Sequence, residues 1–161
     1  MAEILFIEDQ PEVISGLKRM LERRKHHVTI VGSGRETIRR LKERQPDVIV
    51  TDIVLPKGEQ ENGSTVDLEQ MDQQVFGQNA PGFLDGMEGR MGLLILHQMV
   101  DAGIQTPVIV LSAYLTREIT DELEKLKTAG LQIARVFPKP AKASEVIGAI
   151  EDALKTKVEA K

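Results

Sequence analysis

The feature that most constrains this chain is a series of short apolar segments, rich in isoleucine and valine, that alternate with segments of helical spacing. Four of the apolar segments are pronounced and a fifth is weaker, and all are more continuous than alternating. They are Glu3–Ile7, His27–Val31, Asp47–Thr51, Pro107–Leu111 and Gln132–Phe137. Continuous apolar runs of this length are typical of strands buried on both faces, as in a parallel sheet.

The intervening segments show helical patterns with recognisable ends. Pro11 stands where a proline at the first helical position would open a helix, and Ser33 with Glu36 resembles a capping box. Thr116 and Ser144 are the predicted N-caps of two later helices. This alternation indicates an α/β fold, a doubly wound five-stranded parallel sheet with helices on both faces. The expected strand order is 2-1-3-4-5, the flavodoxin-like arrangement.

One long segment interrupts the alternation. Residues 57–89 separate the third predicted strand from the third helix, where a loop of about two to six residues would be usual. The segment carries seven acidic residues against one basic residue. We interpret it as an insertion within a single domain spanning residues 1–161. A short amphipathic helix and a disordered acidic loop remain equally compatible with its sequence.

Composition limits the kinds of partner. The 161 residues are 41% hydrophobic, which fits a globular domain, and the net charge of −4 offers no basic footprint for nucleic acid. The absence of cysteine excludes disulfides and thiolate metal sites. The sequence shows no signal peptide and no apolar run near the roughly 20 residues that span a bilayer. We expect a soluble, cytoplasmic protein without direct nucleic-acid or membrane binding, and the charged segment Lys155–Lys161 leaves no room for an effector domain.

Polar residues stand at the ends of the predicted strands. Glu8 and Asp9 follow the first strand, and Asp52 follows the third. Ser112 follows the fourth, and the fifth leads into Lys139. In a parallel sheet these positions meet at one edge, so three carboxylates, a hydroxyl and an ammonium should share one site. Crowded carboxylates repel unless they protonate or bind a cation, and oxygen ligands favour a hard ion such as Mg²⁺, here held by Asp9 and Asp52.

These groups fit phosphoryl transfer, which depends mainly on positioning and charge stabilisation. Asp52 is the expected nucleophile, forming an aspartyl phosphate. Ser112 is expected to donate a hydrogen bond to the phosphoryl group, and Lys139 to neutralise its charge. Taken singly, these residues have ordinary explanations as a turn former, a loop hydroxyl and a surface charge. Their joint placement at strand ends favours the functional interpretation.

The segments that carry these residues resemble the receiver domains of response regulators in two-component signalling. The resemblance rests on Ile4–Asp9, Pro46–Pro56, Val108–Ala113 and Phe137–Pro140. It covers nearly the whole chain apart from residues 57–89. Together the four motifs are highly specific, and they suggest a stand-alone receiver domain.

The resemblance implies a role for each site residue. Asp52 would be the phosphoacceptor, and Asp9, Asp52 and the backbone carbonyl of Val54 would bind Mg²⁺. Glu8 would act on the metal largely through water. Ser112 would be the switch hydroxyl, and Lys139 would be the lysine that contacts the phosphate.

The resemblance also implies partners. The phosphoryl group would come from a histidine kinase or a phosphotransfer protein, and the signal would pass to a downstream protein target or through a homodimer. The chain would not be an enzyme in its own right, beyond Mg²⁺-dependent self-phosphorylation and autodephosphorylation.

Three departures from the family pattern stand out. The insertion directly follows the phosphorylated strand. The aromatic position three residues before Lys139 holds Val136, and Phe137 should point to the opposite face of its strand. The third departure concerns Val54, two residues after Asp52, and Tyr114, two residues after Ser112, because these positions influence hydrolysis of the phosphoaspartate in the family. Val54 cannot orient the attacking water and Tyr114 could obstruct it, which predicts a long-lived phosphoryl group.

Two other functions compete with this interpretation. An aspartate-nucleophile phosphatase needs a second aspartate two residues after the nucleophile, where this chain has Val54. The other alternative is a protein-interaction module that uses the receiver scaffold without phosphorylation. The complete set of acidic, hydroxyl and lysine groups argues against it.

Overall fold

The computed structural model describes residues 2–55, 74 and 91–159, with the side chains of 157–159 excepted. Within these residues, five parallel strands form one sheet of order β2-β1-β3-β4-β5. The strands are β1 Glu3–Ile7, β2 His27–Val31, β3 Val48–Thr51, β4 Val108–Ser112 and β5 Ile133–Pro138. The predicted fold class and strand order are therefore confirmed, and three of the five strands begin one residue later than predicted.

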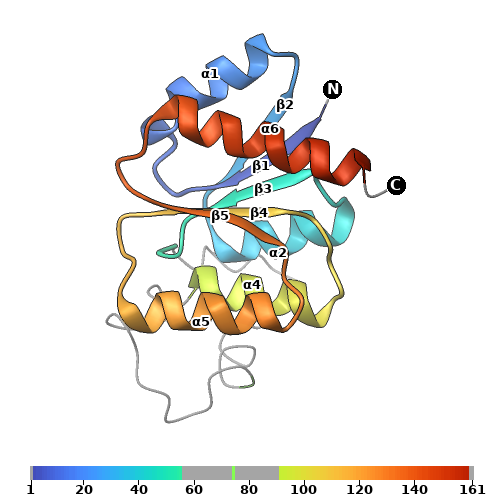
Figure 1. Cartoon of the computed structure of the whole chain (residues 1–161), viewed down its shortest axis with the longest axis vertical. Helices are drawn as coiled ribbons and strands as arrows, with labels where there is room; N and C mark the ends of the chain where they lie inside the picture. Colours follow the sequence, from blue (N-terminus) through green and yellow to red (C-terminus); the bar gives the residue numbers. More distant parts are fainter. Residues whose placement is uncertain (1, 56–73, 75–90, 160–161) are drawn as a thin grey trace, which may run out of the picture.

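Helices cover both faces of the sheet (Figure 1). One face carries α1 (Ser15–Arg23) and α6 (Ala143–Glu159). The opposite face carries α2 (Gly34–Glu43), α4 (Met91–Asp101) and α5 (Arg117–Thr128). None of the helices in the described part of the chain is long and apolar enough to cross a membrane.

Side chains of β1, β3 and β4 alternate between two hydrophobic clusters. In β1, Ile4 and Phe6 pack with the apolar residues of α1 and α6, whereas Leu5 and Ile7 pack with those of α2, α4 and α5. All four side chains are at most 2% exposed. Burial on both faces explains why the sequences of these three strands are continuously apolar.

Two predicted helix caps are present. Ser33 Oγ accepts a hydrogen bond from the Glu36 amide at 3.3 Å, and Thr116 Oγ1 accepts one from the Ile119 amide at 3.3 Å. The Glu36 carboxylate reaches back to the Gly32 amide at 3.4 Å. These contacts satisfy amides that have no partner within their own helix.

Two other predicted helix starts are wrong. Pro11 opens a 3₁₀ turn over Pro11–Val13, because the amides of Val13 and Ile14 bond to carbonyls three residues earlier. The helix α1 begins only at Ser15. Ser144 is not a cap, because α6 already begins one residue before it.

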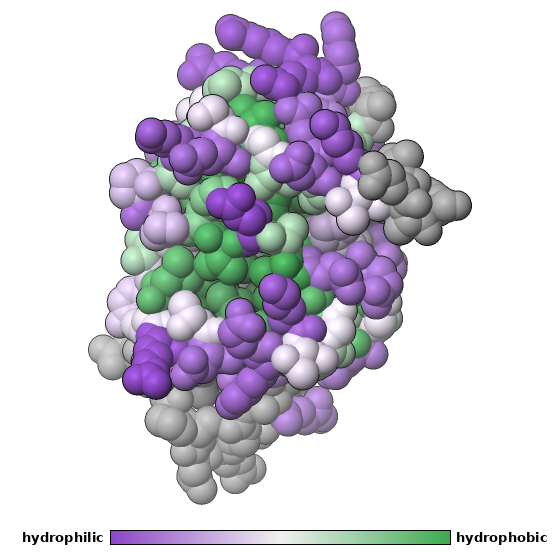
Figure 2. All heavy atoms as spheres, viewed as in Figure 1, coloured by the Kyte–Doolittle hydropathy of each residue, from purple (hydrophilic) through white to green (hydrophobic). Residues whose placement is uncertain are grey.

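The predicted insertion over residues 57–89 lies outside the described residues, apart from residue 74. Figure 2, drawn from the same side as Figure 1, shows apolar side chains gathered around β5, between α6 and α5. A cavity of about 790 Å³ opens at the amino-terminal ends of β4 and β5, where its walls include Pro107, Ile133, Ala149 and Ala153. None of the predicted site residues lines it.

Candidate functional site

The strand register brings four of the predicted site residues to one edge of the sheet. The Asp52 amide donates to the Ile7 carbonyl at 3.0 Å, which fixes the residues after β3 beside those after β1. The Lys139 amide donates to the Ser112 carbonyl at 3.0 Å, which fixes the end of β5 to the end of β4. The carboxyl ends of four strands therefore meet, as expected for a parallel sheet.

The Asp52 carboxylate is buried and its two oxygens have different partners. Oδ1 accepts hydrogen bonds from the Ile53 amide at 2.6 Å, the Val54 amide at 3.2 Å and Ser112 Oγ at 2.7 Å. Oδ2 accepts from Lys139 Nζ at 2.8 Å. Charge-assisted hydrogen bonds of this kind hold a carboxylate in one orientation. The hydroxyl and the ammonium predicted to serve the acceptor both touch it.

Lys139 links Asp52 to Glu8. Its Nζ lies 2.6 Å from Glu8 Oε2, and Glu8 is only 4% exposed. Burial raises the pKa of Glu8, although the nearby ammonium opposes that rise. Burial alone would lower the pKa of Lys139, but hydrogen bonds to Asp52 and Glu8 outweigh it, so the Lys139 pKa is raised. The ammonium stays protonated between two carboxylates.

Asp9 lies apart from this trio. Its side chain is exposed, and the residues described by the structure contain no group of three acidic, histidine or cysteine side chains that could hold a metal ion. In this arrangement the single Lys139 ammonium pairs with both Glu8 and Asp52. The oxygen donors of Glu8, Asp9 and Asp52 nevertheless have the chemistry that a hard cation prefers.

The segment after β4 connects the site to the surface. Ser112 Oγ donates to Asp52 and accepts from the Tyr114 amide at 3.2 Å, and the Tyr114 side chain is 37% exposed. On β5, Val136 is 37% exposed, whereas Phe137 is buried in the cluster beneath α6. The expectation that Phe137 points to the opposite face of its strand from Val136 is confirmed.

Sequence reasoning missed the contribution of the backbone. The amides of Ile53 and Val54 bind the Asp52 carboxylate, and the Gly92 amide donates to the Ile53 carbonyl at 2.9 Å. A glycine directly before the apolar pattern of α4 is the one sequence signal that could have drawn attention to this contact.

Residues 4–75 match the family model of the response regulator receiver domain. Over this segment the chain resembles the response regulator receiver domain family, and its five-stranded sheet of order 2-1-3-4-5 has the fold of the solved receiver domains described below.

Similar proteins include a regulator and several receiver domains. Transcriptional regulatory protein AfsQ1 of Streptomyces coelicolor is 38% identical over 56 residues, which are 35% of this chain and 25% of that protein. The CheY-like receiver domain protein of Methanospirillum hungatei covers 100% of this chain with 99% of its own, at a TM-score of 0.71 and 14% identity. The signal receiver domain of a LuxO repressor protein from Vibrio parahaemolyticus covers 99% of this chain with 95% of its own, at a TM-score of 0.69 and 18% identity. The matched curated relatives are aligned over only 6% to 46% of their length.

Proposed function

We propose that this chain is a phosphoacceptor response regulator of a two-component phosphorelay, phosphorylated on Asp52. The observation that supports the proposal best is the set of contacts at the acceptor. The Asp52 carboxylate is buried to 8% exposure and touches both a hydroxyl, from Ser112, and an ammonium, from Lys139. Phosphoryl transfer needs a held nucleophile and positive charge beside it, and this arrangement supplies both.

The hydrogen bonds distinguish the two carboxylate oxygens. Oδ1 accepts three hydrogen bonds, whereas Oδ2 accepts a single one among the contacts of the described residues, from Lys139. Each carboxylate oxygen has about two lone-pair sites. Oδ2 of Asp52 therefore keeps a lone pair with which to attack the phosphorus of the donor. As the new oxygen–phosphorus bond forms, the bond from phosphorus to the donor's leaving group breaks, and the leaving group takes the electron pair.

Charge develops on the phosphoryl oxygens during this transfer. Lys139 lies beside the attacking oxygen and would neutralise part of that charge, while the Ser112 hydroxyl can turn from Asp52 toward the new group. When bound, Mg²⁺ would supply further charge neutralisation and orientation. Asp9, Asp52 and the Val54 carbonyl would hold the ion, with Glu8 acting through water.

The proposed partners follow from this chemistry. A histidine kinase or a phosphotransfer protein would donate the phosphoryl group, and a downstream protein target or a second copy of the chain would respond to it. We propose no catalytic activity on other substrates beyond the chain's own phosphorylation and autodephosphorylation. The cytoplasm is the proposed location.

A phosphorylation-independent interaction module is the second candidate. The contacts of Lys139 favour it in one respect, because its ammonium already pairs with both Glu8 and Asp52. The exposed Val136, where the family pattern has an aromatic residue, points in the same direction.

One experiment separates the two candidates. The protein is incubated with acetyl phosphate and Mg²⁺, and wild type is compared with Asp52→Ala by intact mass. We expect a phosphoryl adduct on wild type and none on the variant. Asp121→Ala, which removes an exposed aspartate from α5, is the matched control and should accept the group normally. An adduct that persists in Asp52→Ala would refute the acceptor assignment, and no adduct on any protein would favour the interaction module.

A further inference from the structure

The first turn of α4 packs directly against the backbone of the phosphoacceptor. Besides the hydrogen bond from the Gly92 amide to the Ile53 carbonyl, the Gly92 α-carbon itself approaches this segment closely. A β-carbon at position 92 would lie 2.5 Å from Ile53 Cα and 2.6 Å from the carbonyl oxygens of Asp52 and Ile53. Real β-carbons essentially never approach other heavy atoms to under 3.0 Å. Gly92 is therefore the residue that permits this contact.

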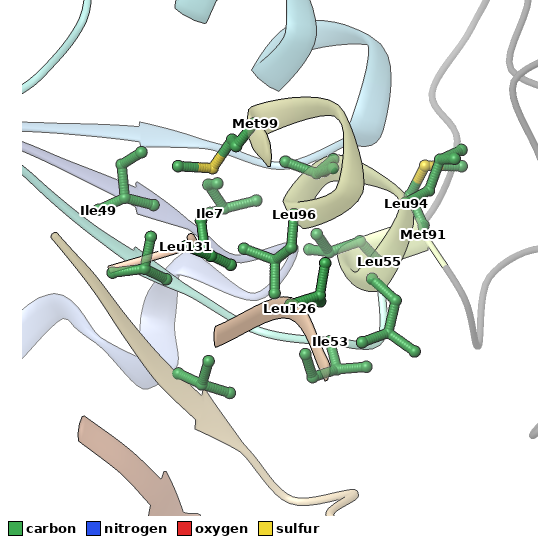
Figure 3. Packing of buried hydrophobic residues seen from close by; sticks show 14 of the residues in the cluster. Ile7, Ile49, Ile53, Leu55, Met91, Leu94, Leu96, Met99, Leu126 and Leu131 are labelled. Atoms are coloured by element: carbon green, nitrogen blue, oxygen red, sulfur yellow. The ribbon is translucent and has the colours of Figure 1, made fainter. Parts of the chain in front are cut away.

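What lies opposite Gly92 makes the contact unusual. The crowded atoms belong to the peptide backbone that carries Asp52, so no side-chain rotation can relieve them. Gly34, at the start of α2, offers a comparison, because a β-carbon there would collide with the side chain of Met91, which is flexible. Figure 3 shows Ile53 and Leu55 in the same packed layer as Met91, so the acceptor segment is also held from its apolar side.

The same peptide orients the carboxylate. The amides of Ile53 and Val54 both donate to Asp52 Oδ1, and the Gly92 amide holds the carbonyl of Ile53. An alanine at position 92 would require the backbone to move by at least about 0.5 Å, the difference between the 2.5 Å approach and the 3.0 Å limit. Reacting groups need placement to within roughly 0.5 Å, and misplacement by 1 Å can reduce a rate by about 100-fold.

We propose that Gly92 is a positioning residue for Asp52: its bare α-carbon and its amide fix the peptide from which the acceptor carboxylate projects. The proposal rests on the proposed function of Asp52 as phosphoacceptor. It assigns the start of α4 a task in the chemistry, in addition to covering the sheet.

The test compares three glycine variants on the full chain. Gly92→Ala forces the backbone to move, Gly34→Ala requires only a side chain to move, and Gly148→Ala in α6 meets nothing within 4 Å. Two quantities are measured on each folded protein. One is the rate of phosphorylation at saturating acetyl phosphate with Mg²⁺, and the other is the hydrogen-exchange rate of the Ile53 and Val54 amides, followed by NMR.

We expect Gly92→Ala to phosphorylate at least about 10-fold more slowly and to exchange the two amides at least about 10-fold faster than wild type. Gly148→Ala should match wild type in both readouts, because alanine is ordinarily favoured over glycine in a helix. Gly34→Ala should stay within about threefold of wild type in both. Gly92→Ala with wild-type exchange and a wild-type rate would overturn the proposal.

Two further outcomes are decided by the same design. If wild type takes no phosphoryl group, the proposed function fails, and the exchange rates of the Ile53 and Val54 amides still decide whether Gly92 positions them. If Gly92→Ala does not fold, the residue is replaced by glycolic acid, which removes the amide donor without adding a β-carbon. A wild-type rate and wild-type exchange in that protein would also overturn the proposal.

Discussion

Replacing Lys139 with methionine tests whether the ammonium holds the site together. Lys139 Nζ lies 2.6 Å from Glu8 and 2.8 Å from Asp52, and its side chain is 16% exposed. The side chains of the two acidic partners are 5% and 10% exposed. Methionine keeps most of the volume of the lysine stem but removes the charge. The variant therefore leaves two buried carboxylates facing each other.

The expected cost follows from this burial. Removing one partner of a buried ion pair typically costs about 3–5 kcal/mol, because the other charge is left without compensation. Partial exposure and protonation of Glu8 limit the loss, so we expect about 3 kcal/mol at neutral pH. For a chain of this size that corresponds to a fall of about 6–12 °C in the melting temperature.

The loss should depend on pH. The pKa of Glu8 is already raised above 4.5 by burial, and Lys139 opposes that rise, so its removal should raise the pKa further. A carboxyl whose pKa is raised in the folded state keeps its proton up to a higher pH in the folded state than in the unfolded state. Unfolding free energy is then lost as pH rises from about 4.5 to the folded-state pKa. The deficit of the variant should be small at the low end of that window and largest at neutral pH.

The assay is urea unfolding followed by circular dichroism at pH 5 and pH 7.5. Lys125→Met is the matched control, because Lys125 is 76% exposed and its 3.6 Å pair with Glu122 is a surface contact worth little. An equal loss for Lys139→Met at both pH values, or a loss below about 1 kcal/mol at pH 7.5, would refute the reasoning. At alkaline pH, wild type and Lys125→Met should both lose stability as the raised pKa of Lys139 is crossed, above its usual 10.5, whereas Lys139→Met lacks this loss.

Three further predictions concern signalling and stability. Tyr114 is the only tyrosine and there is no tryptophan, so intrinsic fluorescence reports on Tyr114 alone. Because the Tyr114 amide donates to the Ser112 hydroxyl, the fluorescence should change when Asp52 is phosphorylated. An unchanged spectrum would show that this hydrogen bond does not transmit phosphorylation to Tyr114. The phosphoryl group should persist beyond seconds with Mg²⁺ present, because Val54 cannot orient a water; decay within seconds would contradict this. Thr116→Ala should lose about 1 kcal/mol in urea unfolding through its lost cap, whereas Ser144→Ala should lose little, and equal losses would contradict the observed helix starts.

The sequence predicted the architecture and the meeting of Asp52, Ser112 and Lys139 in one site. Continuous apolar strands and alternating helices specify a parallel sheet, and a parallel sheet brings the residues after its strands to one edge. Asp52, Ser112 and Lys139 therefore meet as expected, since only their place in the strand order was needed.

The sequence was less informative where neighbouring elements decide the outcome. Pro11 suits both a 3₁₀ turn and the start of an α-helix, and the structure places the start of α1 at Ser15. Ser144 is a good capping residue, but α6 begins one residue before it. Local preferences of this kind are weak and are readily overridden by tertiary contacts.

By itself, then, the sequence determined which strand ends carry polar groups at the carboxyl edge of the sheet, because local patterns of polarity specify the strands and their alternation with helices, and such strands run parallel. The tertiary structure decided how those groups are paired. Lys139 lies between Glu8 and Asp52, while Asp9 remains exposed. Gly92 of α4 packs closely against the backbone of Asp52 and Ile53. These arrangements depend on side-chain orientation and on close packing between distant segments, and no local pattern in the sequence encodes such distances.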